Sequence, residues 1–211
     1  NFSIKDFKAG KQLNKKKLCD DFDMDINLPL FIFIGRLVGE KSADLLAPAI
    51  TRAFEEHGKI LNILILGSGE PSVEHALYSL NNKWVGYYNT QIKKKKKLSH
   101  QMYAGADFLL MPSRVEPCGL NQLYAMRYGT MPLVRKTGGL KDTVPDFGDE
   151  GGYGITFIQA SVEDITHAMQ RAITLYNNQK QLNKLRETMM NVNNSWEQSA
   201  SKYIDLYSSI L

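Results

Sequence analysis

Short apolar runs alternate with helical patterns along most of this chain, and this alternation limits the folds that it can adopt. Continuous apolar runs have the pattern of β-strands that are covered on both faces. The predicted strands lie at residues 30–34, 60–66, 84–88, 107–111 and 131–135. Strands that alternate with helices form right-handed βαβ units and a parallel sheet. The sequence therefore predicts an α/β fold, a Rossmann-like parallel sheet with helices on both faces.

The helices are predicted from apolar residues that recur three or four positions apart. One helix begins at Gly119, with Leu120 and Tyr124 on one face. Ser161 opens a capping-box pattern that begins another helix. The other predicted helices lie near residues 42–57, 73–80, 180–191 and 196–210.

The chain has 211 residues, enough to bury the core of one domain. Hydrophobic residues make up 43% and charged residues 23%, the balance of an ordinary globular domain. We therefore expect one α/β domain over residues 29–211. Residues 1–28 are polar with sparse apolar anchors, and we expect a lead-in segment with one short helix on an interdomain side.

Charge and cysteine content narrow the function classes. The net charge is +4, and much of it comes from lysine runs at residues 15–17 and 93–97. Aromatic residues do not interleave with these runs, so we interpret them as solvated surface rather than as a nucleic-acid site. Cys19 and Cys118 lie far apart in the sequence and suggest a reducing cytoplasm rather than a disulfide framework. Apolar runs are too short for a membrane span and the histidines stand singly, so neither a membrane partner nor a metal site is expected.

The loop over residues 112–119 joins a predicted strand to a predicted helix. In an open parallel sheet such loops lie at the carboxyl ends of the strands, where ligands bind, and a helix start presents unpaired N–H groups to an anion. Pro117 restricts the backbone of Glu116, so we expect a fixed carboxylate at this rim. Cys118 could be a thiol nucleophile, but no histidine lies nearby in sequence, and packing or substrate lining is the favoured interpretation.

Arg36 and Lys41 flank the first predicted strand-to-helix turn. Two cations at this edge suit a diphosphate, whose leaving-group charge they would stabilise. On spacing alone, a pair of exposed surface cations fits better. Gly67 and Gly69 follow the second strand, a pattern that suits a tight turn and a nucleotide contact equally. Tyr87 is, by sequence alone, an ordinary strand aromatic.

Residues 111–124, Met-Pro-Ser-Arg-x-Glu-Pro-Cys-Gly-Leu-x-Gln-Leu-Tyr, carry a specific resemblance. Together with residues 129–134 and 136–144, they resemble the carboxyl-terminal half of bacterial glycogen synthases and plant starch synthases. The resemblance starts near Gly35 and runs to Tyr207, so it covers nearly all of the chain beyond the first two dozen residues. It implies the carboxyl-terminal half of a GT-B fold, in which two Rossmann-like domains face each other and of which the amino-terminal domain is missing here.

The resemblance implies a retaining hexosyltransferase that moves glucose from ADP-glucose to the non-reducing end of an α-1,4-glucan. The family's phosphate-binding cations fall on Arg36 and Lys41, and Glu116 contacts the donor glucose, so these three are the expected catalytic residues. No metal or other cofactor is implied. The nucleotide and substrate positions that it implies are Arg36, Lys41, Gly67, Gly69, Tyr87, Cys118, Gly119, Leu120, Asn121 and Tyr124.

Several positions depart from the family's pattern. Ser42 stands where glycine is usual, and Asn121 replaces a common threonine. Related retaining transferases have a second glutamate at the position of Tyr124. Glycogen synthases have tyrosine there, as this chain does. Tyr87 matches the family's base-stacking aromatic, but extra residues follow it up to Leu98. Because base choice depends on this region, UDP-glucose stays open as the donor.

Two further interpretations stay open. One is another nucleotide-sugar transferase of the sucrose- or trehalose-forming type, against which the Glu-Pro-Cys-Gly-Leu sequence argues. The other is a non-catalytic nucleotide- or nucleic-acid-binding module, suggested by the basic runs. In the family, acceptor and donor meet between two domains, so the missing domain is an expected partner and the chain alone is expected to be inactive.

Overall fold

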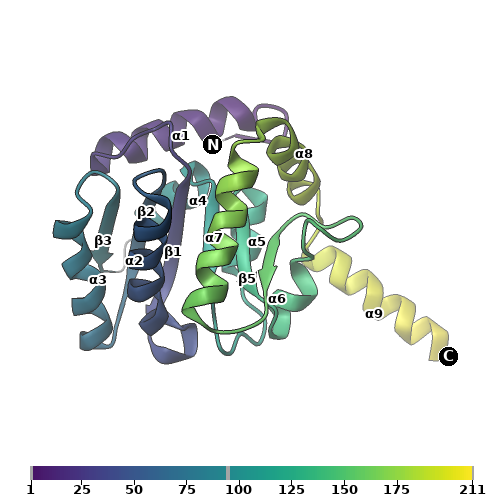
Figure 1. The fold of residues 1–211 in the computed structure, drawn as a ribbon. Helices are drawn as coiled ribbons and strands as arrows, with labels where there is room; N and C mark the ends of the chain where they lie inside the picture. Colours follow the sequence, from purple (N-terminus) through teal and green to yellow (C-terminus); the bar gives the residue numbers. More distant parts are fainter. Residues whose placement is uncertain (1, 94–95, 211) are drawn as a thin grey trace.

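The computed structural model describes residues 2–93 and 96–210. Within them, six parallel strands form one sheet in the order β3-β2-β1-β4-β5-β6 (Figure 1). The strands are β1 (Leu30–Leu37), β2 (Asn62–Gly69), β3 (Tyr88–Ile92), β4 (Phe108–Met111), β5 (Met131–Arg135) and β6 (Ile155–Phe157). The expected α/β parallel sheet is confirmed, and its strand order reverses between β1 and β4.

Helices cover both faces of this sheet. One face carries α2 (Leu46–His57), α3 (Pro71–Lys83) and α7 (Val162–Tyr176), and the other carries α4 (Lys96–Gly105), α5 (Asn121–Arg127) and α6 (Gly138–Thr143). Alternate residues of a strand pack against the helices on opposite faces of the sheet. Phe31 packs on the face of the first three helices and Ile32 on the other face, each with no exposed surface. This explains why the strands are apolar without alternation.

The first helix, α1 (Phe7–Phe22), lies across the amino edge of the sheet (Figure 1). The expectation of a short helix in a lead-in segment is wrong, because α1 has 16 residues and packs Leu18 and Cys19 into the core beside α4. Lys15 is also buried, whereas Lys16 and Lys17 are exposed as expected. Polar residues dominate α1, so its buried face was not visible in the hydrophobic pattern.

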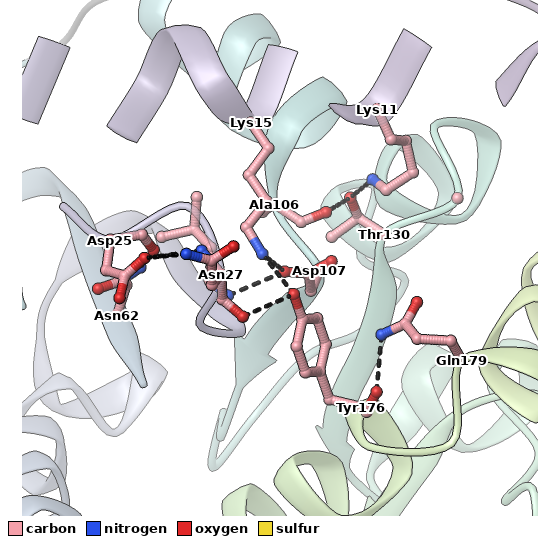
Figure 2. Close-up of polar contacts among 12 residues, drawn as sticks. Lys11, Lys15, Asp25, Asn27, Asn62, Ala106, Asp107, Thr130, Tyr176 and Gln179 are labelled. Atoms are coloured by element: carbon pink, nitrogen blue, oxygen red, sulfur yellow. Dashed lines mark hydrogen bonds and ion pairs between the residues drawn. The ribbon is translucent and has the colours of Figure 1, made fainter. Parts of the chain in front are cut away.

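A buried ion-pair network explains how this polar helix is held. Asp107, just before β4, accepts hydrogen bonds from Lys15 Nζ at 2.7 Å and from an Arg186 guanidinium nitrogen at 2.6 Å (Figure 2 shows the Lys15 side). Its carboxylate also accepts the backbone N–H of Leu30 at 2.9 Å. Arg186 comes from α8 (Gln179–Met190), so one carboxylate ties α1, α8 and β1 to β4. Burial alone would raise the pKa of Asp107, but Lys15 and Arg186 lower it overall.

Two strands differ from the sequence expectation. The segment 84–88 is a turn that leads into β3, because Trp84 leaves α3 to stack on Phe54 and Gly86 takes a φ of +83°. The strand β6 was missed, since its three residues follow a glycine-rich loop and are too few to show a pattern.

The last helix, α9 (Trp196–Ile210), extends away from the rest of the fold (Figure 1). None of its residues is buried, and Trp196, Tyr203 and Tyr207 are among its exposed apolar side chains. Over residues 2–93 and 96–210, no helix combines the length and the apolar character that crossing a bilayer requires.

The network around Asp107 generates a stability prediction. Asp107→Asn leaves two buried cations without their carboxylate and should lower the free energy of unfolding by about 3 to 5 kcal/mol. Because the folded-state pKa of Asp107 is lowered, its contribution is present above the unfolded pKa and is lost as the pH falls through the folded pKa. The variant should therefore lose part of the acid sensitivity of the parent chain.

Urea unfolding of the parent chain and the variant, followed across pH, measures both effects. Asp20→Asn is the matched control, because Asp20 pairs with Lys16 on the exposed side of α1. It should change the stability by no more than about 0.5 kcal/mol. Equal losses in the two variants would contradict the assignment.

Candidate active site

A cavity of about 320 Å³ opens where the carboxyl ends of β1 and β4 separate. Residues 33–35 of β1 form one wall, and the end of β4 with residues 113–121 forms the other. This is the point where the strand order reverses, at which open α/β sheets bind ligands. Lys41 and Glu116, predicted from different parts of the sequence, both line it.

The side chains of Lys41 and Glu116 form an ion pair inside this cavity. Lys41 Nζ lies 2.7 Å from Glu116 Oε2, and the hydroxyl of Ser113 donates to the same oxygen at 3.1 Å. The side chains of Lys41 and Glu116 are only 19% and 11% exposed. The carboxylate is therefore held from two sides, with an ammonium group beside it that can also meet an incoming anion.

The turn that presents Lys41 explains the unusual residue after it. Residues 39–41 form a tight helical turn, and Ser42 follows with a φ of +51°. A left-handed backbone favours glycine, which is why glycine is usual at this position in the resembling family. Ser42 adopts this left-handed conformation while fully buried.

Arg36 lies at the same edge but faces a neighbouring cavity. This second cavity, of about 430 Å³, is lined by Arg36, Gly67, Lys93 and Lys96, and it shares residues 34–35 with the first. The Arg36 side chain is 62% exposed and pairs with Glu40 at 3.0 Å. The two expected cations thus line adjoining halves of one cleft.

Gly67 and Gly69 have a structural reason to be glycine. A Cβ on Gly67 would lie 2.1 Å from the carbonyl oxygen of Gly35, and one on Gly69 would lie 2.3 Å from that of Leu37. Close approach of β2 to β1 therefore requires both glycines. Only Gly67 of the two lines the cavity beside Arg36, within the described residues.

The loop that carries Glu116 is supported by the next helix, α6. The backbone N–H of Gly139 donates to the carbonyls of Glu116 at 3.1 Å and Pro117 at 3.2 Å. The start of α6 thus binds carbonyls of the loop at close range, and a Cβ on Gly139 would lie 2.2 Å from the Cys118 oxygen.

Gln122 is a site residue that sequence reasoning missed. It is fully buried, and its amide donates to the carbonyls of Cys118 at 3.0 Å and Gly119 at 3.1 Å. This supports the turn in which Gly119 takes a φ of +74°. The available signal was an amide on the face of α5 that also buries Ala125 and Met126.

The other expected residues of this loop and helix have different surroundings. Asn121 donates to the carbonyl of Ile34 at 2.7 Å and so ties the start of α5 to β1. Leu120 and Tyr124 do share a face, but it is more than half exposed, and Leu120 also lines the Glu116 cavity. Cys118 is exposed at the rim.

Tyr87 is placed away from this cleft, which corrects the expectation of a base-stacking role. It precedes β3, its carbonyl accepts from the N–H of Ile63 at 2.8 Å, and Lys59 Nζ lies 5.2 Å from its ring centroid. These contacts are at the amino edge of the sheet, opposite Lys41 and Glu116. The strand had been predicted four residues too early.

The lysine run follows the true end of β3 at Ile92. Lys93 and Lys96 therefore reach the cleft beside Arg36, while residues 94–95 of the run lie outside the described residues. Lys93 and Lys96 are exposed, as expected for solvated surface, and they line this cleft as well. In the part of the chain that the structure describes, no group of three or more His, Cys, Asp or Glu side chains suits a metal ion.

The contact between α6 and the Glu116 loop generates a prediction about packing. Gly139→Ala forces a methyl group against the Cys118 carbonyl and should lower the free energy of unfolding by about 1 to 3 kcal/mol. Gly39→Ala is the control, since a Cβ there meets nothing within 4 Å, and it should stay within about 0.5 kcal/mol. Thermal and urea unfolding compare them, and equal stability of both variants would show that the loop yields easily.

Comparison with known proteins shows the family to which this chain belongs. The family model described as glycosyl transferases group 1 matches residues 16–189. A glycogen synthase from Flavobacterium johnsoniae is 52% identical over 211 residues, which are 100% of this chain and 44% of that protein. A glycogen synthase from Finegoldia magna is 39% identical over a 214-residue alignment, which covers 100% of this chain and 44% of that protein. The chain thus spans less than half the length of these relatives.

Solved structures show the same fold. The catalytic domain of starch synthase IV from Arabidopsis thaliana, bound to ADP and acarbose, matches 99% of this chain and 44% of its own with a TM-score of 0.88 and 33% identity. A sucrose-phosphate synthase from Thermosynechococcus elongatus matches 92% of this chain and 48% of its own with a TM-score of 0.67 and 20% identity, and it shows the fold alone. The chain has the α/β Rossmann-like fold of GT-B glycosyltransferases and belongs to the glycosyl transferases group 1 family, in which it resembles glycogen and starch synthases.

Proposed function

We propose that the chain binds the nucleotide-sugar donor of a glycogen- or starch-synthase-type transferase. The protein would move glucose from ADP-glucose to the non-reducing end of an α-1,4-glucan with retention of the anomeric configuration. The observation that carries the proposal is the Lys41–Glu116 pair in the cavity where β1 and β4 separate. The relative from Arabidopsis thaliana bound to ADP and acarbose supports the donor class.

The diphosphate would lie between the two cavities. Lys41 would meet it from the Glu116 side and Arg36 from the other, because the cavities share residues 34–35. These cations would stabilise the charge that develops on the leaving ADP. Backbone N–H groups of residues 118–120 would face the phosphates, and the charge would then be neutralised without a metal ion.

Glu116 would act on the sugar side. An oxocarbenium-like transition state carries positive charge, which a fixed carboxylate stabilises more than it stabilises the neutral donor. Ser113 holds this carboxylate, and α6 holds its backbone, so it is already oriented without a ligand. Lys41 has three donor hydrogens and can keep Glu116 while it binds phosphate.

The chain alone would bind the donor without extending a glucan. It spans 44% of its glycogen synthase relatives, and the acceptor would meet the donor between this domain and a second one. The second domain and the α-glucan are thus proposed partners, and a cytoplasmic setting stays a prediction from the two cysteines. Glucose incorporation into glycogen by the purified chain would contradict this part.

Titration calorimetry of the 211-residue chain with ADP, UDP and their glucose conjugates tests the donor. Lys41→Ala and Arg36→Ala should each weaken ADP binding by about 1.5 to 3 kcal/mol, the range for a hydrogen bond to a charged group. The control is Lys59→Ala at the opposite edge beside Tyr87, which should leave the Kd unchanged. ADP affinity equal to that of the parent chain in all three variants would contradict the assignment of Lys41 and Arg36 to the phosphates.

Salt dependence separates the proposal from a nucleic-acid-binding module. Neutralising several phosphates releases counterions, so nucleic-acid affinity falls steeply with salt, whereas an ADP-glucose pocket should respond mildly. A preference for UDP-glucose in the calorimetry would change the proposed donor and would keep a transferase of the sucrose- or trehalose-forming type open.

Glu116→Gln in the longer protein separates chemistry from binding. Glutamine keeps the size but loses the charge that favours a cationic sugar, so turnover should fall by about 10²-fold or more. ADP affinity should hold or rise, because the variant no longer occupies Lys41 with a carboxylate. Steady-state rates and ADP titration on the same variant measure both quantities.

Glu163→Gln is the matched control, since Glu163 pairs with Arg52 on an exposed surface. It should leave rate and affinity unchanged. Parallel small losses in Glu116→Gln would instead make Glu116 a structural loop residue, and equal large losses would make it a scaffold of the nucleotide site.

A further inference from the structure

The turn that carries Lys41 and the loop that carries Glu116 are joined by contacts besides the ion pair of these two side chains. The carbonyl of Glu40 accepts the backbone N–H of Arg114 at 2.9 Å and that of Val115 at 3.3 Å. Glu40 comes just before Lys41, and the two donors come just before Glu116. The backbone segments that present the ammonium and the carboxylate are therefore linked directly.

The side chain of Arg114 adds a second link to the same turn. Its guanidinium donates to the carbonyl of Gly39 at 2.6 Å and to both carboxylate oxygens of Asp44, at 2.6 and 2.8 Å. Gly39 and Asp44 lie on either side of Lys41 in the sequence, so one guanidinium holds the turn before and after the lysine. A two-pronged contact between arginine and a carboxylate fixes geometry as well as charge.

The loop end of this link is itself fixed to the sheet. Arg135 is the last residue of β5, and its Nε donates to the carbonyl of Ser113 at 2.8 Å. Another nitrogen of the same guanidinium donates to the carbonyl of Arg114. Ser113 in turn donates its hydroxyl to the Glu116 carboxylate. The backbone at Arg114 therefore has a fixed position, from which its side chain reaches the turn that carries Lys41.

Exposure and charge show what Arg114 can contribute. The side chains of Arg114 and Asp44 are 39% and 41% exposed, and an ion pair with this exposure adds little to stability. The hydrogen bonds from Arg114 lower the pKa of Asp44, so this carboxylate stays ionised near neutral pH. Among the described residues, neither side chain lines either cavity of the cleft. Arg114 can therefore act on a ligand only through the residues that it holds.

We propose that Arg114 is a positioning residue, which places Lys41 against Glu116 by joining the turn of one to the loop of the other. The ammonium group is then already ordered in the cleft when an anion arrives. A ligand binds more tightly to a group that needs no reordering, because the loss of side-chain freedom has taken place on folding. The effect on ADP rests on the proposed function, whereas the placement of Lys41 against Glu116 does not.

Acetylation of lysine amines, read residue by residue by mass spectrometry, tests this placement without a ligand. In the 211-residue chain Lys41 should react slowly, because Glu116 holds its ammonium group. Arg114→Met should raise the rate at Lys41 by about twofold or more, the lower end for a coupling lost within one network. Lys59, which is exposed at the opposite edge of the sheet, should react as before. An unchanged rate at Lys41 would overturn the proposal.

Controls in the same experiment separate this effect from unfolding. Lys11 is 5% exposed, so faster acetylation there would report a loss of the fold. If Arg114→Met is unfolded, Asp44→Asn decides the matter, since it removes the carboxylate from an exposed pair and should also speed acetylation of Lys41. Arg52→Met is the matched control, because Arg52 is 42% exposed and pairs with two carboxylates elsewhere, and it should leave the rate at Lys41 unchanged.

Calorimetry with ADP on the same chain tests the consequence for the ligand. Arg114→Met should weaken ADP binding by about threefold to tenfold, and it should have no further effect in the Lys41→Ala background, because it acts through that lysine. An equal loss in both backgrounds would make Arg114 a direct ligand contact and overturn the positioning role. Arg114→Lys keeps the charge but cannot make the two-pronged contact, so full recovery of affinity in that variant would overturn it too.

Failure of this proposal can be told apart from failure of the proposed function. If ADP does not bind, or if Lys41→Ala leaves its affinity unchanged, the donor assignment fails, and the acetylation rates still decide whether Arg114 positions Lys41. If Lys41→Ala weakens ADP binding and Arg114→Met does not, the donor assignment stands and the positioning role is overturned.

Discussion

The rest of the structure depends on how β1 pairs with β4. Their register is limited to Phe31 with Phe108 and Ile32 with Leu109, although β1 continues to Leu37. At the amino edge Asp107 holds the strands together, through its backbone and its carboxylate, on Leu30. Beyond Ile32 the strands separate, and the gap between them becomes the cavity that contains Lys41 and Glu116. The short pairing of β1 with β4 therefore joins these strands at the amino edge of the sheet and leaves them separated at the carboxyl edge.

The two edges use charge differently. At the carboxyl edge, the side chains of Lys41 and Glu116 are partly exposed in a cavity that has room for a ligand. In the proposed function, the ammonium group would bind the phosphates and the carboxylate would act on the sugar. At the amino edge, Asp107 is nearly surrounded by Lys15 and Arg186, and the pair of contacts organises helices rather than a reaction.

Support for the Glu116 loop comes from residues other than the Lys41–Glu116 pair. Gly139 and Gln122 hold its carbonyls, and Asn121 ties the following helix to β1. In the proposed transfer, preorganisation of this kind would let the carboxylate act without rearrangement when the sugar bond breaks. The glycines at 138 and 139 are thus needed for close contact between α6 and the loop, since any Cβ there would meet backbone atoms.

Sequence alone determined the parallel α/β sheet, most of its buried strands and the place of Glu116 in a strand-to-helix loop, because strand periodicity and strand-to-helix loops depend on local order along the chain. Only the tertiary structure decided that Lys41 meets Glu116. It misplaced Tyr87, because an aromatic cluster in a turn has the same composition as a strand. It missed the burial of Lys11 and Lys15, because a polar helix shows no apolar stripe, and only tertiary contacts decide which lysines meet Asp107 and buried carbonyls. Only the folded chain decides what compensates a buried charge, since its partners lie about a hundred residues away in sequence.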